Sequence, residues 1–144
     1  ESSIDNEIMR VTNGLSNSSA GGSVINALNA ERSSKGLQTL NNGSDAQKLA
    51  NLFAADMATY DNTSSSSPTY GTIDQMMSRY NIGNQGYGLN IWRTTSDDAQ
   101  SIHKRFQSIN NCRTARMNEN FNQVGVAIYY NNGYYYVAEV LLKQ

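Results

Sequence analysis

The C-terminal segment "QVGVAIYYNNGYYYVAEVLL" constrains the fold more than any other part of the chain. It contains two runs rich in β-branched and aromatic residues, 123–130 and 134–142, and such runs are typical of strands. Between them lies Asn-Asn-Gly, which favours a tight turn because Asn and Gly tolerate a positive φ. The segment therefore predicts an antiparallel β-hairpin.

A third strand is predicted at "GYGLNIW", residues 86–92, where apolar and polar side chains alternate. The remaining segments carry apolar residues at helical spacing behind capping residues. The expected helices are 23–36 with Ser23 as N-cap, 44–57 and 72–80 with the capping boxes "SDAQ" and "TIDQ", and 95–109 capped by Thr95 or Ser96. Helical connections combined with a terminal hairpin predict an α+β fold, a three-layer α-β-α sandwich with an antiparallel sheet flanked by helices.

The first 22 residues differ in pattern from the rest. Residues 3–16 place Ile4, Ile8, Val11 and Leu15 at helical spacing, and "NSSAGGS" then resembles a linker. We therefore expect residues 1–22 to be an N-terminal helical arm and linker, and residues 23–144 to be the main domain. The arm could pack on that domain or on a second copy of the chain.

Composition excludes several classes of protein. Eleven Lys and Arg residues against twelve Asp and Glu give a net charge of -1, so no basic surface is predicted for nucleic acid. No apolar run approaches the ~20 residues that span a membrane. One cysteine permits no internal disulfide. Only 16% of the residues are charged, and the abundance of Asn, Ser, Tyr and Gly favours a secreted or surface protein.

The order of the motifs carries a family resemblance over residues 23–142. "VINALNAERSSKGLQTL", "AADMA", "SSSSPTYGT", "GLNIW", "FQSINNCR" and "NFNQVGVAIYY" follow one another as in the CAP superfamily. That superfamily contains cysteine-rich secretory proteins, antigen-five allergens and plant pathogenesis-related proteins, and this chain most resembles its disulfide-free bacterial branch. The resemblance implies an α-β-α sandwich in a secreted or cell-surface protein of a bacterium.

The resemblance also implies a cleft, but this chain departs from its chemistry. In the bacterial branch, two histidines and a glutamate line the cleft and can hold a divalent metal or move protons. Here Ser65 stands three residues before Pro68 in place of the first histidine. Leu89 replaces the glutamate before Asn90, and Cys112 replaces the second histidine before Arg113. A hydroxyl, a hydrocarbon and one thiol make no metal site, so no metal and no cofactor are expected.

Cys112 allows two interpretations. Beside Arg113 it could be a nucleophile with a lowered pKa, or it could be a small side chain that fills space. A nucleophile would need a base, and His103 is the only histidine. On one unbroken helix, nine residues would separate the two side chains by roughly 13 Å. This spacing disfavours a Cys-His pair, and His103 on an apolar helical stripe is as readily explained by packing.

The final hairpin carries five tyrosines, which suit a recognition surface but also ordinary half-buried strands. Self-association through this hairpin or through residues 1–22 is one possibility that the sequence raises.

Two classes of function remain. The first is a non-catalytic binding or interaction module with a degenerate cleft, whose partner is a small molecule, a lipid or a protein. The second is a protease- or nuclease-like hydrolase whose catalytic residues around Cys112 the sequence does not identify, with Glu139 or Glu31 as one candidate partner of Cys112. The candidate cleft residues are Ser65, Ser67, Tyr70, Leu89, Asn90, His103, Cys112 and Arg113.

Overall fold

The predicted hairpin is confirmed in the computed structural model, which describes residues 2–144. Strands β3 (Gln123–Asn131) and β4 (Tyr134–Leu142) pair in antiparallel register from Asn131↔Tyr134 to Gln123↔Leu142. The turn residues Asn132 and Gly133 have φ values of 51° and 91°. Both values lie in the left-handed region that a type I′ turn requires.

The hairpin forms the centre of a four-stranded antiparallel sheet of order β1-β3-β4-β2. Strand β2 (Tyr87–Thr94) pairs along its whole length with β4, as its alternation predicts. Strand β1 (Ser16–Asn17) pairs with the opposite edge of β3. Two residues are too few to show a period of two, so no sequence pattern predicts β1.

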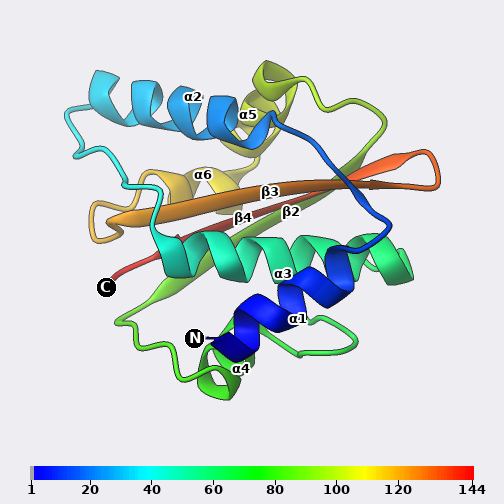
Figure 1. Cartoon of the computed structure of the whole chain (residues 1–144). Coiled ribbons are helices and arrows are strands. Elements are labelled where there is room, and N and C mark those ends of the chain that lie inside the picture. The colour runs from blue at the N-terminus through cyan, green and yellow to red at the C-terminus, as the bar shows by residue number, and fades with distance from the viewer. Residues whose placement is uncertain (1) are drawn as a thin grey trace.

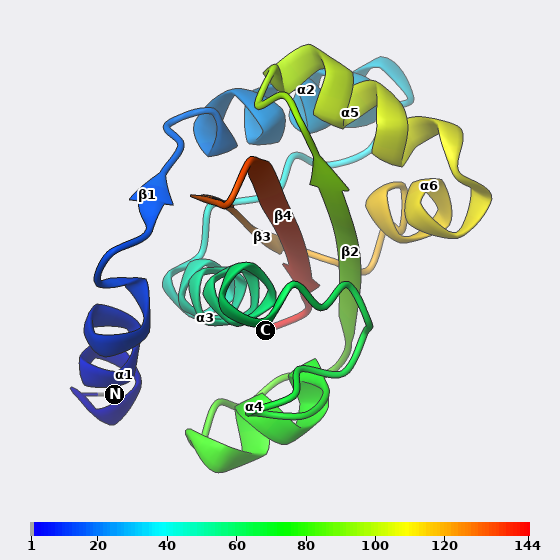
Figure 2. The same ribbon diagram turned by 90° about the vertical axis from the view of Figure 1, so that its right-hand side faces the viewer.

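Helices cover both faces of this sheet (Figures 1 and 2). One face carries α1 (Ser2–Thr12), α3 (Ser44–Tyr60) and α4 (Ile73–Arg79). The other face carries α2 (Gly21–Ser34), α5 (Ala99–Ser108) and α6 (Asn110–Arg116). The sheet therefore separates two hydrophobic clusters, one on the α3 side and one on the α2 side. This arrangement is the predicted α-β-α sandwich.

Gly125 in β3 allows the start of helix α3 to approach the sheet closely. A Cβ atom at Gly125 would stand 2.5 Å from the backbone of Ala46 in α3. No other residue fits there, so glycine at this position sets the spacing between the helix and the sheet.

The segment between α1 and α2 is more regular than expected. Residues 17–23 were predicted as a linker, but they contain the end of β1 and the start of α2, which begins at Gly21 rather than after Ser23. A Cβ atom at Gly21 would stand 2.8 Å from the carbonyl oxygen of Val126. Glycine at this position allows a close approach between α2 and β3. The neighbouring Ala, Gly and Ser residues do not indicate this role, because such a composition is typical of a linker. Glu1, the first residue of the expected arm, lies outside the described residues.

Of the two predicted capping boxes, the one at Thr72 is confirmed and the one at Ser44 is wrong. Thr72 and Gln75 exchange side-chain to backbone hydrogen bonds. At α3 the N-cap is Gly43, because the Gln47 side chain pairs instead with the backbone N–H and C=O of Val126 at 3.2 and 2.9 Å. The hydrogen bonds of Gln47 to strand β3 thus replace the capping box that was predicted within α3.

The predicted helix 95–109 also begins and ends differently. Asp98, not Thr95 or Ser96, is its N-cap and accepts from the Ser101 N–H at 2.9 Å. The helix stops at Ser108, and Ile109 adopts an extended conformation before α6 starts.

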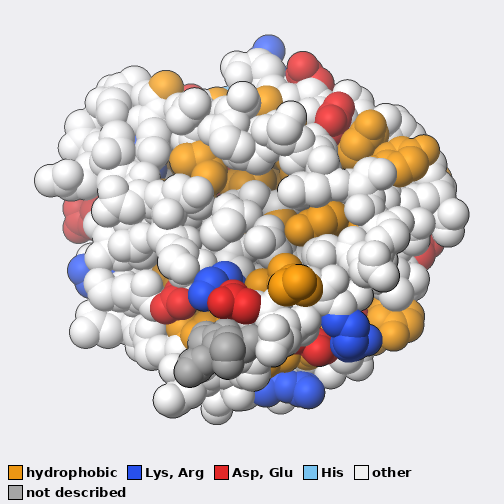
Figure 3. Space-filling model, viewed as in Figure 1, with side chains coloured by type: hydrophobic (Ala, Val, Ile, Leu, Met, Phe, Trp, Pro, Cys, Tyr) orange, Lys and Arg blue, Asp and Glu red, His pale blue; other side chains and the backbone are white. Residues whose placement is uncertain are grey.

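The surface is poor in charge, as the composition requires. In the face shown in Figure 3, backbone and uncharged polar side chains cover most of the area, with small groups of charged and hydrophobic side chains between them. No helix within residues 2–144 has the length and hydropathy needed to cross a bilayer.

Candidate functional site

The three positions that depart from the CAP pattern do not converge. Ser65 is exposed in the loop after α3. Leu89 packs against the hydrophobic cluster on the α3 side of the sheet, whereas Cys112 packs against the cluster on the α2 side. Their side chains therefore offer no common set of donors.

Ser67 and Tyr70 lie on the α3 side, where each is bonded to an acidic residue. The Ser67 hydroxyl donates to Asp56 in α3, and Thr69 donates to the other oxygen of that carboxylate at 2.6 Å. The Tyr70 hydroxyl donates to Glu7 in α1. Burial, and then this bond, raise the pKa of Tyr70. These contacts fasten the loop to two helices, and they occupy the polar groups that the sequence offered as cleft residues.

Asn90 lies on the opposite side of β2, in a buried polar network. Its Nδ2 donates to Glu139 Oε1 at 2.9 Å. The same carboxylate is paired with Arg116, whose Nε and Nη2 stand 3.0 and 3.3 Å from its two oxygens. Both members of this ion pair are completely buried. Because Glu139 is fully engaged, it is not a free base for Cys112.

His103 extends the network towards the surface. Its Nδ1 lies 3.0 Å from Arg116 Nη1, and because arginine can only donate, Nδ1 must accept and carry no proton. Its Nε2 lies 3.6 Å from Glu31 Oε1. Burial, followed by the Arg116 charge, lowers the pKa of His103, although Glu31 and Glu139 oppose this. The histidine is thus held neutral with both ring nitrogens engaged.

This environment makes stability depend on pH. With the folded-state pKa lowered, the unfolded chain takes up the proton first. The contribution of neutral His103 is complete above the unfolded-state pKa of about 6.5 and is lost as the pH falls from there towards the folded-state pKa. Denaturant unfolding between about pH 5 and 8 measures it. We expect the free energy of unfolding to depend less on pH in His103→Asn, whose amide oxygen can replace Nδ1 as acceptor. If the free energy of unfolding changes equally with pH in both proteins, this explanation is contradicted.

Cys112 is half-buried and free. Burial, and then the Glu139 charge, raise the pKa of its thiol, while Arg116 and Arg105 oppose them. Arg113 does not activate it, because its guanidinium instead donates to the Gln107 carbonyl at 3.1 Å, at the end of α5. The break after Ser108 also removes the unbroken helix on which the spacing of His103 and Cys112 was based. These features support a thiol that fills space.

Arg32 is a buried residue that the sequence did not single out. It is fully buried in α2 without an acidic partner among residues 2–144. Its Nε donates to the Gln38 carbonyl, and its Nη1 donates to the carbonyls of Arg116 and Asn118 at 2.7 and 3.0 Å. Arg32 therefore anchors the loop that follows α6. No pattern in the sequence marks it, because its partners are backbone carbonyls, two of which lie 84 and 86 residues away.

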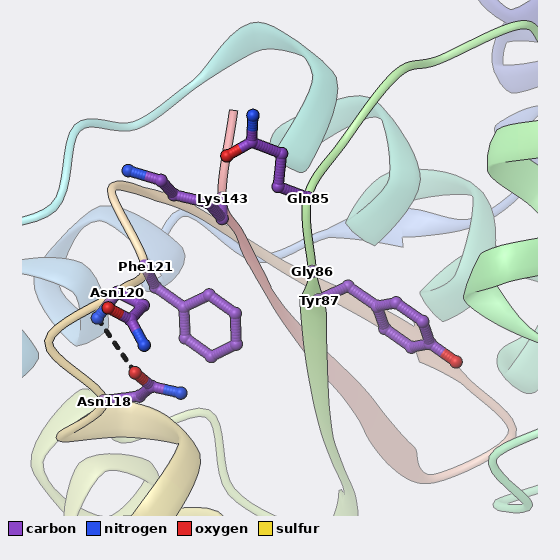
Figure 4. A pocket seen from close by; sticks show the side chains of 7 residues that line it. All are labelled: Gln85, Gly86, Tyr87, Asn118, Asn120, Phe121 and Lys143. Carbon is purple, nitrogen blue, oxygen red and sulfur yellow. Dashed lines mark hydrogen bonds between the residues drawn. The ribbon is translucent and has the colours of Figure 1, made fainter.

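That loop forms one wall of a pocket of about 470 Å³ at the start of β2 (Figure 4). The Phe121 ring points from the loop towards β2, whereas Tyr87 points away from it. The opposite wall is held by backbone hydrogen bonds of Lys143 with Gln85 and Gly86, at 2.8 and 3.0 Å. The pocket is lined by Gln85, Gly86, Tyr87, Asn118, Asn120, Phe121 and Lys143.

The polar groups of this pocket are available to a ligand. Within the described part of the chain, the side-chain amides of Gln85 and Asn120, the Asn118 Nδ2 and the Lys143 ammonium have no hydrogen-bond or ion-pair partner. The Asn118 Oδ1 is fixed by the Asn120 N–H at 2.8 Å. Amides that can donate and accept, one cation and one phenyl ring suit a polar organic molecule.

The side chains do not fit the metal that a CAP cleft implies. Throughout residues 2–144, no three His, Cys, Asp or Glu side chains come close enough together to hold a metal ion. The donor set at the substituted positions is a hydroxyl, a hydrocarbon and a protonated thiol, which zinc does not select.

Comparison with known sequences identifies the family. The sequence model of CAP, the cysteine-rich secretory protein family, matches residues 25–141. The chain therefore belongs to the CAP family. No curated protein is significantly similar to it.

Solved structures share its fold at low sequence identity. An extracellular protein containing an SCP domain from Bacillus anthracis matches with a TM-score of 0.76 and 22% identity over 87% of this chain. A cysteine-rich secretory protein from Staphylococcus aureus matches with a TM-score of 0.68 and 18% sequence identity over 89% of this chain. The chain spans 40% and 39% of those two proteins. An outer surface protein from Borrelia burgdorferi matches with a TM-score of 0.74 and 11% sequence identity. The match covers 83% of this chain and 89% of the Borrelia protein.

Proposed function

We propose that this chain is an extracellular CAP domain that binds a ligand without catalysing a reaction. The observation that carries the proposal is where the side chains of Ser65, Leu89 and Cys112 lie in the fold. One is exposed, and the other two pack on opposite faces of the sheet. Burial, and then the Glu139 charge, raise the pKa of the Cys112 thiol, and the Glu139 carboxylate is paired with Arg116. At these three positions, general acid-base, nucleophilic and metal-assisted hydrolysis each lack a necessary group.

Two further features support this function. The pocket in Figure 4 offers unpaired amides and an ammonium group on walls that hydrogen bonds hold in place. Its size falls in the range of about 300–1,000 Å³ typical of small-molecule sites. The extracellular and outer-surface descriptions of the Bacillus and Borrelia proteins support a location outside the cell.

Two measurements test the proposal: calorimetric titration with zinc, and assays of hydrolysis. We expect no calorimetric signal for zinc in the wild type, and no cleavage of casein or of single-stranded DNA with or without zinc. Cys112→Ser is the matched control for a thiol-dependent reaction. The triple variant Ser65→His, Leu89→Glu, Cys112→His restores the family's side chains, but because Leu89 and Cys112 pack on opposite faces of the sheet we expect no zinc binding there either; zinc binding by this variant would show that the three positions converge. Wild-type zinc binding at micromolar affinity, or cleavage that Cys112→Ser abolishes, would contradict the non-catalytic assignment.

A further inference from the structure

A second pocket, of about 390 Å³, lies between the first strand and the turn end of the hairpin. Strand β1 runs along the edge of β3 there (Figure 2). The lining consists of Ser16, Asn17, Ser18, Ser19, Asp97, Tyr130 and Tyr135. This pocket shares no residue with the one in Figure 4, and neither the CAP pattern nor the proposed function uses it.

The two tyrosines form a tilted aromatic pair. Tyr130 and Tyr135 are directly opposite in the register of β3 and β4. Their ring centroids are 4.9 Å apart with an interplanar angle of 57°. Both tyrosines line the pocket, and Tyr130 is 39% exposed, so the aromatic pair is accessible from it. The face of an aromatic ring carries negative potential and attracts cations.

Asp97 adds the only formal charge to the lining. Its Oδ2 accepts from the Ser18 hydroxyl at 2.7 Å, a bond between segments 79 residues apart. No Lys or Arg lines this pocket, and Asp97 has no ion-pair partner within residues 2–144. The carboxylate is therefore fixed in position beside the aromatic pair but is not neutralised.

The wall that faces the tyrosines is also held in place. The Ser18 N–H donates to the Ile128 carbonyl at 2.9 Å, and the Ala20 N–H donates to the Ser18 hydroxyl at 3.2 Å. Together with the β1 pairing, these bonds make a preformed wall from a segment whose composition is typical of a linker. A preformed site loses less conformational entropy on binding.

We propose that this pocket binds an organic cation through its ammonium group, with methylated ammonium preferred. The carboxylate of Asp97 would neutralise the charge, and the two tyrosine faces would contact the methyl groups by cation–π and apolar interactions. An anionic ligand would meet an uncompensated carboxylate. A neutral sugar could bond to the serines but would leave the charge of Asp97 unmatched.

Tetramethylammonium chloride is the probe that tests this proposal, with sodium chloride as the matched salt. We expect shifts of the amide resonances of residues 16–19, 97, 130 and 135 in nuclear magnetic resonance spectra, saturating at millimolar concentration. Asp97→Asn and Tyr130→Leu should each weaken binding about fivefold or more, since one cation–π or ionic contact contributes on the order of 1 kcal/mol. Tyr134→Leu is the matched control, because Tyr134 is similarly exposed but lies outside the pocket.

Two further ligands distinguish the source of the cation. Co-sedimentation with phosphatidylcholine vesicles that Asp97→Asn abolishes would identify a lipid headgroup. A response to soluble trimethyl-lysine amide without vesicle binding would identify a free cation or a protein side chain. The proposal fails if tetramethylammonium causes no shifts beyond those of sodium chloride, if Asp97→Asn and Tyr130→Leu bind as the wild type does, or if a neutral trisaccharide shifts these resonances and tetramethylammonium does not. None of these outcomes bears on the zinc and hydrolysis tests.

Discussion

Replacing Glu139 by glutamine is expected to lower the free energy of unfolding by about 3–5 kcal/mol, as measured by denaturant titration. Glutamine has nearly the same shape, so packing is conserved, but the Arg116 guanidinium loses the carboxylate with which it is paired. Both side chains have no exposed surface. A buried charge left without its partner cannot recover its solvation from water, which makes this loss larger than that of a surface pair.

Two comparisons separate charge from packing. The double variant Glu139→Leu, Arg116→Met removes both charges together, and we expect it to be more stable than Glu139→Gln. Asp5→Asn, which breaks the exposed pair between Asp5 and Lys48, should cost less than about 1 kcal/mol. A cost for Glu139→Gln as small as that of Asp5→Asn would mean that the network contributes nothing beyond a surface contact.

Local signals explain which parts of the fold were predictable. The hairpin turn at Asn132 and Gly133, the alternation of β2 and the capping box at Thr72 each depend on residues that are neighbours in sequence. Strand β1 depends on pairing with Tyr129 and Tyr130, more than a hundred residues away. A two-residue strand of Ser and Asn has no local pattern, so only the folded sheet defines it.

The same distinction applies to the helix break at Ile109. Ile102, Phe106 and Ile109 continue one helical stripe, and this periodicity predicted a helix through the break. In the structure, Ile102 and Phe106 are buried, but Ile109 is 36% exposed. The polar residues that flank it favour caps and turns over helix interiors, and Arg113 donates to a carbonyl at the end of α5.

The candidate site was predicted from residues that are neighbours in the sequence. Its chemistry, however, is determined by residues that are neighbours in the folded structure. Cys112 lies beside Arg113 in the sequence, but burial and Glu139 decide its pKa. Arg32 and Arg116, the two fully buried arginines, look like surface residues of helices until their partners are known. The substitutions at the family positions were visible in the sequence, whereas both pockets became visible only in the fold.

The N-terminal helix gives the second large effect that we expect. Ile4 is fully buried and belongs to the hydrophobic cluster between α3, α4 and the sheet. Ile8, Val11 and Leu15 pack against the same cluster. Replacing Ile4 by alanine removes buried methyl and methylene groups and leaves a cavity, which typically costs about 2–5 kcal/mol.

Met9→Ala is the matched control, since Met9 lies on the same helix but is 73% exposed. It should change the free energy of unfolding by no more than about 0.5 kcal/mol. A chain that begins at Ser23 loses the whole apolar stripe of α1 together with β1, and we expect its melting temperature to fall further than that of Ile4→Ala. Thermal unfolding followed by circular dichroism measures all three. If the shortened chain melts with the wild type, residues 1–22 contribute no stability to the domain, and the cluster around Ile4 is closed by other residues.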